Sequence, residues 1–265
     1  MSLLNKLLQL TLISLGFLSL PAAALEKDAA SLALVDKVVQ AYGGPAQIEQ
    51  MVSLNADGLI NAIVRNASGT YKRWFQRPRM LRVETVYPET TETRVLNGEL
   101  AWRITGGNMM VGVEGPSRQA MIYQYKQLDL PYGLLKGRYN LRHAGTETVA
   151  NQATEAMEIW DEEGPNIRVN VDATTHLIVK VTGQIAFGSQ TMVLAAEFSD
   201  FRPVDGTPMP FHMKNYAGST TISETVITRY AINPTVDPTL FVPRVKGRES
   251  AMSEVANALV AVTAN

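Results

Sequence analysis

The sequence predicts a single α+β domain in which antiparallel strands curl into a half-open barrel covered by α-helices. Apolar residues recur at helical spacing near the beginning, middle and end of the chain, whereas most of the remaining sequence alternates apolar and polar residues. No Pro-, Gly- or Ser-rich linker divides the 265 residues into two domains. Long strands joined by hairpins tend to curl, so an incomplete barrel is the expected architecture.

Two helices are expected first. In Asp28–Ala41 apolar residues recur every three or four positions, and Asp28 is a suitable N-cap. The Gly43-Gly44 pair ends this helix, and Pro45 opens a short second one that runs through Met51.

The hydrophobic period then changes from 3.6 to 2. Residues 52–65 predict a long strand with one buried face, and Asn66–Gly69 predicts a turn. We expect Thr70–Tyr87 to form a second long strand interrupted at Pro78, where a bulge would fit. The Asn97-Gly98 pair, a strong hairpin signal, joins the strands expected at 91–96 and 99–105.

The second half of the chain combines a helix with further strands. Ser117–Lys136 has helical spacing and is expected to break near Pro131. Residues 203–210, which contain three prolines, predict a loop. Alternating segments predict strands at 157–159, 167–171, 177–181, 190–202, 211–216 and 221–230, and the spacing in 249–262 predicts a C-terminal amphipathic helix.

Composition argues against several classes of function. Lys and Arg total 24 against 25 for Asp and Glu, and this balance gives no reason to expect nucleic acid as a partner. The absence of Cys excludes a disulfide framework, a thiolate metal site and a lipid-modified N-terminal Cys. The three His are isolated, and no motif of a hydrolase, a nucleotide site or a metal site occurs. We therefore expect no enzyme, no cofactor and no metal.

Residues 1–24 have the organisation of a cleaved signal peptide. A lysine precedes an apolar run, and small residues occupy the −3 and −1 positions of a cut after Ala24. A transmembrane anchor is the alternative, but the apolar run is shorter than the ~20 residues that span a bilayer. We expect an exported protein whose residues 25–265 form one domain.

The segment Tyr71–Arg82 is unusual because it contains five basic and three aromatic residues. It is consistent with an edge strand protected by charge, with Pro78 marking the edge. It is also consistent with a functional strand, because an Arg that faces an apolar cavity can hold the polar head of a ligand.

Two motifs here carry a resemblance to a known family. Trp74–Arg82, followed by Val95–Trp102, resembles the LolA/LolB-like family of outer-membrane lipoprotein-sorting proteins, in which an aromatic-x-x-Arg-Pro strand precedes a Gly-centred hairpin ending in an aromatic. Phe198–Pro210, continuing through Asn233 and Phe241–Pro243, is similar to the back half of the longer members.

The resemblance implies a barrel whose apolar interior holds the acyl chains of a lipoprotein or another lipid. Arg77 matches the Arg that helps to control lid closure and ligand hand-over in the family's carrier, whereas Leu81 stands where the family has an aromatic residue. Without Cys, the chain resembles the soluble periplasmic carrier rather than the lipid-anchored receptor. An inner-membrane transporter and an outer-membrane acceptor are the implied partners.

Strand alternation places Phe75 and Arg77 on the same face. We expect Arg77 at the rim of the cavity, bonded to a backbone carbonyl when the cavity is empty, in a contact that contributes only about 0–1 kcal/mol. The lid is expected in residues 106–115 and 117–136. The candidate lipid-binding residues are Phe75, Arg77, Leu81, Leu100 and Trp102 on the strands, with Met109, Met110 and Met121 from the lid.

Two functions are consistent with these features. The first is a periplasmic carrier that sequesters acyl chains, because burying each methylene contributes about 0.8 kcal/mol without any catalytic residue. The second is a periplasmic sensor or regulatory module that uses the same barrel for recognition. Lipid that co-purifies with the protein would distinguish the carrier from the sensor.

Overall fold

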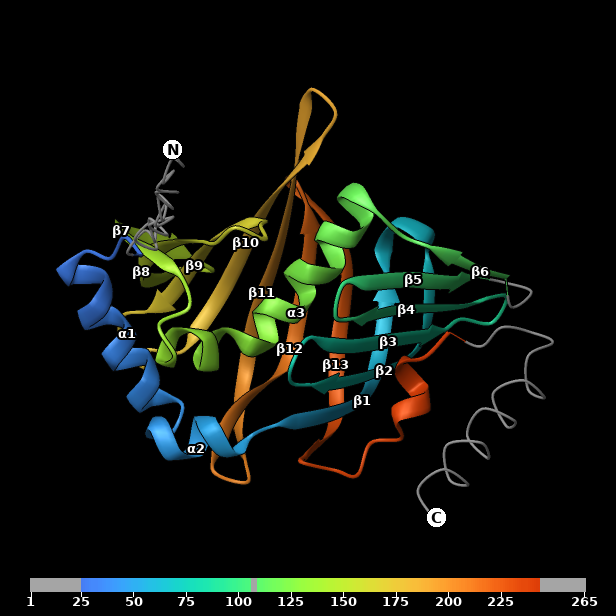
Figure 1. Cartoon of the computed structure of the whole chain (residues 1–265), viewed down its shortest axis with the longest axis horizontal. Helices are drawn as coiled ribbons and strands as arrows, with labels where there is room; N and C mark the ends of the chain where they lie inside the picture. The colour runs from blue at the N-terminus through green and yellow to red at the C-terminus, as the bar shows by residue number, and fades with distance from the viewer. Residues whose placement is uncertain (1–24, 106–108, 244–265) are drawn as a thin grey trace, which may run out of the picture.

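The computed structural model describes residues 25–105 and 109–243, which form one antiparallel sheet of 13 strands with three α-helices (Figure 1). The helices are α1 (Ala29–Ala41), α2 (Gly44–Gln50) and α3 (Gly115–Leu135). The strands are β1 (Ser53–Ala62), β2 (Ala67–Gln76), β3 (Met80–Val86), β4 (Thr91–Asn97), β5 (Leu100–Thr105), β6 (Met109–Gly112), β7 (Asn140–Val149), β8 (Gln152–Trp160), β9 (Asn166–Asp172), β10 (Ile178–Phe187), β11 (Gln190–Val204), β12 (Thr207–Ala217) and β13 (Thr220–Ile232).

The order of the strands explains the position of the central helix. The sheet runs β6-β5-β4-β3-β2-β1-β13-β12-β11-β10-β9-β8-β7, so two meanders extend outward from the central β1–β13 pair. The edge strands β6 and β7 are consecutive along the chain and do not pair with each other. Helix α3 connects these two edges and therefore crosses the curved sheet, as Figure 1 shows. The expected half-open antiparallel barrel covered by helices is confirmed.

Helix α1 forms as the sequence predicts. The Asp28 carboxylate accepts hydrogen bonds from Ser31 N at 2.8 Å and from His143 N of β7 at 2.7 Å, and these bonds lower the pKa of Asp28 to about 2. Leu34 and Val38 are fully buried on the face that packs against β7 to β10. The cap thus fixes the start of α1 and ties it to the sheet.

Helix α3 is buried rather than a loose lid. Tyr123 packs so closely on Gly183 of β10 that a Cβ at position 183 would lie 2.6 Å from its ring. The expected break near Pro131 is wrong, because the helix continues to Leu135. Leu130 and Leu134, on either side of Pro131, are buried in the core, and this packing holds the last turn in place.

Three expectations about strands need correction. The β2–β3 hairpin occupies residues 67–86, where a turn at 66–69 and one long strand at 70–87 were expected, and Pro78 lies in the turn of the hairpin. Residues 63–65 form a 3₁₀ turn, so the strand expected at 52–65 ends at Ala62. Residues 203–210 form the paired ends of β11 and β12. Pro203 and Pro208 face each other across the ladder and Pro210 lies two positions farther along β12, and these alternate pairs donate no backbone N–H to the partner strand.

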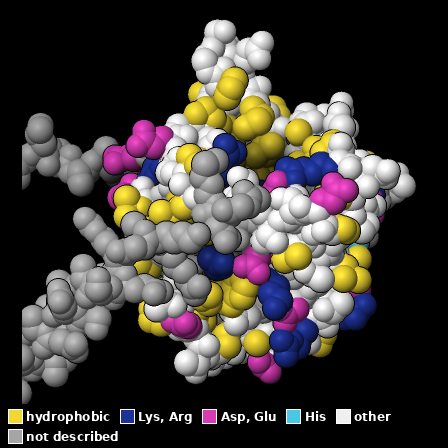
Figure 2. Space-filling view, turned by 90° about the vertical axis from the view of Figure 1, so that its right-hand side faces the viewer, with side chains coloured by type: hydrophobic (Ala, Val, Ile, Leu, Met, Phe, Trp, Pro, Cys, Tyr) yellow, Lys and Arg dark blue, Asp and Glu magenta, His cyan; other side chains and the backbone are white. Residues whose placement is uncertain are grey.

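Apolar side chains pack on both faces of the sheet. Two large clusters lie on the face covered by the helices, which we call the inner face. A smaller cluster on the opposite face, the outer face, contains Val95, Trp102 and Phe241, and the 3₁₀ turn η2 (Pro238–Phe241) lies over it. Charged side chains of both signs are interspersed on the side of the molecule shown in Figure 2.

Two predicted segments lie outside the described residues, namely the signal peptide at 1–24 and the C-terminal helix at 249–262. Within residues 25–105 and 109–243, none of the helices has the length and apolar character needed to cross a membrane.

Candidate lipid-binding site

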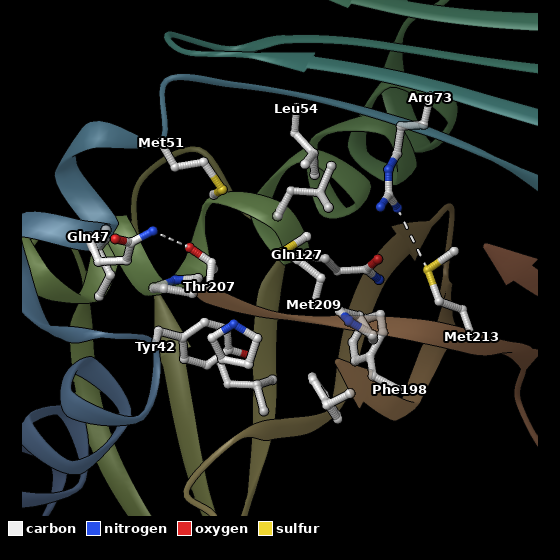
Figure 3. Close-up of a pocket in the computed structure, with 17 residues that line it drawn as sticks. Tyr42, Gln47, Met51, Leu54, Arg73, Gln127, Phe198, Thr207, Met209 and Met213 are labelled. Atoms are coloured by element: carbon white, nitrogen blue, oxygen red, sulfur yellow. Dashed lines mark hydrogen bonds between the residues drawn. The ribbon is translucent and has the colours of Figure 1, made fainter. Parts of the chain in front are cut away.

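A cavity lies beneath α3, between this helix, α2 and the sheet (Figure 3). Its free volume is about 60 Å³, and its walls are mainly apolar. The lining side chains include Tyr42, Met51, Leu54, Leu128, Ile178, Phe198, Met209 and Met213. These residues belong to helices and strands from both meanders, so the cavity exists only in the folded barrel.

A second cavity of about 120 Å³ lies nearer the N-terminus of α3 and has more polar walls. Gln124 of α3, Asn215 of β12 and Ser223 of β13 contribute to it. Arg73 and Gln127 line both cavities and therefore stand between them.

The size of these spaces limits what they can hold. Pockets for drug-sized ligands usually enclose about 300–1,000 Å³. The two cavities hold about 60 and 120 Å³, so an acyl chain does not fit them as they stand. To bind here, an acyl chain must displace α2 or α3 from the sheet.

Arg77 connects the elements that would have to separate. Its Nε donates to Asp129 Oδ1 of α3 at 2.6 Å, and its Nη1 donates to the backbone carbonyls of Met51 and of Ile48 in α2. Its guanidinium also stacks 3.9 Å from the ring centre of Tyr132 in α3. One side chain thus holds the β2–β3 turn, α2 and α3 together.

The ion pair between Arg77 and Asp129 is almost completely buried. The Asp129 side chain is only 2% exposed, and that of Arg77 is 9% exposed. Burial raises the pKa of Asp129, whereas Arg77 and Arg138 oppose this shift. Arg77 is bonded to backbone carbonyls as expected, but its buried pair with Asp129 is not the weak contact of about 0–1 kcal/mol that the sequence predicts.

Arg73 is the second arginine on the inner face and differs sharply from Arg77. The residue is 7% exposed, and no carboxylate of the described residues lies within ion-pair distance of it. Its Nη1 points toward Met213 Sδ at 3.7 Å, as Figure 3 shows, and its Nε has no hydrogen-bond partner.

The structure brings together only part of the predicted set. Phe75, Leu81 and Met121 belong to one inner cluster, and Phe75 stacks on Tyr125 of α3 at 5.2 Å. Leu81 also lines the second cavity. Met109 lies in the edge strand β6.

Three of the predicted residues do not line the interior. Trp102 and Met110 pack in the outer cluster, and Leu100, on the same face of β5 as Trp102, is 64% exposed. For Leu100 and Trp102 the reason is the direction of alternation in β5, where Ala101 faces the inner cluster and its two neighbours face away.

Several lining residues were missed by reasoning from the sequence. Arg73 could have been found, because it alternates with Tyr71 and Phe75 and therefore shares their inner face. Gln127 of α3 and Met209 and Met213 of β12 could not have been found. They come together only because α3 crosses the sheet at this point, and the sequence does not reveal that path.

The fold defines a class of proteins, namely open antiparallel barrels with a helix across the inner face. Neither a family model nor a curated protein matches the sequence. Solved structures do match. A LolA superfamily protein from Nitrosomonas europaea has a TM-score of 0.53 at 12% identity, over 80% of this chain and 97% of that one.

Two further structures are similar to the same extent. A DUF1329 family protein from Desulfovibrio piger has a TM-score of 0.52 at 14% identity, over 80% of this chain and 97% of that one. A domain assigned to outer membrane lipoprotein sorting, from Vibrio parahaemolyticus, has a TM-score of 0.52 at 11% identity, over 80% and 96%. The chain therefore has the LolA-like fold, as the motif at 74–82 indicates.

Proposed function

We propose that this protein is an exported periplasmic carrier that holds the acyl chain of a lipoprotein or another lipid beneath α3. The observation that carries the proposal is the apolar cavity between α3 and the sheet, in a fold shared with a lipoprotein-sorting domain and a LolA superfamily protein. Apolar burial supplies the driving force, because each methylene removed from water contributes about 0.8 kcal/mol. An inner-membrane donor and an outer-membrane acceptor would complete the transfer.

Opening of the cavity requires the contacts of Arg77 with α2 and α3 to break. Ile48 and Met51, whose carbonyls bond Arg77, also line the cavity next to α3. A chain that enters at this end therefore separates α2 from α3 and breaks the contacts of Arg77. These contacts re-form when the lipid leaves, so closure of the cavity favours release of the lipid to an acceptor.

Native mass spectrometry of the protein purified from a periplasmic extract without detergent tests the proposal. We expect a bound mass in the range of an acyl lipid. Leu128→Trp fills the cavity and should lower lipid occupancy, whereas Leu100→Trp makes the same change at an exposed position and should not. Absence of lipid from the wild-type protein, both as purified and after incubation with lipid, would contradict a carrier function.

A further inference from the structure

Arg73 occupies the middle of the inner face. In the register of the sheet it lies opposite Ala56 of β1 on one side and Val83 of β3 on the other, and Ala56 in turn lies opposite Tyr230 of β13. The short side chain of Ala56 leaves room for the guanidinium, which lies close to the hydroxyls of Tyr71 and Tyr230. The charge is thus placed deep in the barrel, at the wall that the two cavities share.

This charge is not neutralised by the residues that the structure describes. Burial raises the pKa of Tyr230 to about 12, so its hydroxyl is neutral at pH 7. That hydroxyl donates a hydrogen bond to the backbone carbonyl of Pro210 at 2.6 Å. Arg73 Nη1 donates to the thioether of Met213, which is a weak acceptor, and the neighbouring tyrosine hydroxyls carry no negative charge to match the guanidinium. Arg77 makes the contrast clear, because its side chain is also largely buried but pairs with Asp129.

A buried guanidinium without an anion is costly to the fold. Arginine cannot lose its proton in a protein, and a buried charge is tolerated when it is paired and hydrogen-bonded. The Nε donor of Arg73 also has no partner. Arg73 and its surroundings are therefore suited to bind an anion that is not part of the chain.

The surroundings of Arg73 fit an anion that carries an apolar tail. On one side the first cavity offers Leu54, Phe198 and Met209 to a hydrocarbon chain. Gln127 of α3 lines both cavities beside Arg73, and its side-chain amide is a second donor for the head group. Carboxylate and phosphate both match the planar fork of a guanidinium.

We propose that Arg73 binds the anionic head group of the cargo, so that the protein carries a single-chain lipid with a carboxylate or phosphate head. This inference rests on the proposed carrier function and narrows it. The acyl chains of a lipoprotein end in methyl groups and would leave Arg73 unpaired. A lipid anion pairs with it and removes the cost of the isolated charge.

Binding of three ligands with the same hydrocarbon chain tests the inference. Hexadecanoate, hexadecyl phosphate and hexadecanol are titrated into the delipidated protein, with inorganic phosphate as a fourth ligand. We expect at least one of the two anions to bind about tenfold or more tightly than hexadecanol. Tighter binding of the carboxylate or of the phosphate identifies the head group. Inorganic phosphate alone should not compete, because it lacks the apolar tail.

Arg73→Met removes the charge and keeps much of the volume. We expect this variant to bind the preferred anion about tenfold or more weakly and to bind hexadecanol unchanged. Its lipid-free form should melt at a higher temperature than the wild-type protein, because an unpaired buried charge has been removed. A merely structural arginine would give a lower melting temperature. Arg73→Lys should recover part of the preference for the anion, and Lys72→Gln, at an exposed position next to it, should change nothing.

The outcomes separate the two proposals. If the anions and hexadecanol bind the wild-type protein equally, and Arg73→Met preserves all these affinities, the role of Arg73 is refuted and the carrier function stands. If inorganic phosphate displaces the lipids at comparable concentration, the site is one for a free anion and the inference is also refuted. If no chain-bearing ligand binds at all, the carrier function itself fails.

Discussion

Replacing Arg77 by leucine is expected to lower the free energy of unfolding by about 3–5 kcal/mol. The change leaves the Asp129 carboxylate, which is 2% exposed, without its closest cation. Arg138 Nη1 lies 3.4 Å from the other oxygen of Asp129 and should keep the loss near the lower end of this range. Unfolding in urea, with an unchanged m-value, measures the effect.

The double variant Arg77→Leu/Asp129→Leu is the matched control. Removal of both charges leaves no unpaired carboxylate, so we expect this variant to recover most of the lost stability. A loss below about 1 kcal/mol in the single variant would show that the pair behaves as an exposed contact. That result would also remove Arg77 from the closure of the cavity.

Phe241→Ala should cost a similar amount, about 3–5 kcal/mol, for a different reason. Phe241 is 1% exposed and packs in the outer cluster with Val95 and Trp102. Asn97 Nδ2 and Arg82 Nη1 donate to the carbonyls of Phe241 and Leu240, and these bonds hold the segment against the sheet. Thermal and urea unfolding give the size of the loss.

Substitutions on the two faces of the sheet should differ in their effect on the affinity for lipid. Phe241→Ala should leave the affinity for lipid unchanged at a temperature where the variant is folded, because the outer cluster is separated from the cavities by the sheet. Phe75→Ala, on the inner face against Tyr125, should change both stability and affinity. An equal loss of affinity in both variants would contradict the assignment of the cavity to the inner face.

Local patterns in the sequence predicted most of the architecture. The alternation in β2 correctly placed Phe75 on the side of Arg77, and the Asn97-Gly98 turn correctly joined β4 to β5. These features depend on neighbouring residues, which is why the sequence reveals them. The prolines of 203–210 were misleading because a proline also fits those strand positions that donate no ladder bond.

The site depends on contacts between residues that are distant in the sequence. Arg77 and Asp129 are 52 positions apart, and nothing in the local pattern of α3 marks Asp129 as a buried partner. Trp102 was expected in the interior, but the sheet buries apolar side chains on both faces, and Trp102 packs on the outer one. The unpaired state of Arg73 is visible only when every neighbour is in place.

The methionines on the two faces of the sheet report directly whether lipid binds between α3 and the sheet. Met209 and Met213 line the first cavity, whereas Met80 and Met110 belong to the outer face. With carbon-13-labelled methionine methyl groups and a fatty acid that carries a nitroxide on its chain, we expect the NMR signals of Met209 and Met213 to broaden. The signals of Met80 and Met110 should stay sharp. Broadening of Met80 and Met110 instead, or of no methionine at saturating lipid, would contradict binding between α3 and the sheet.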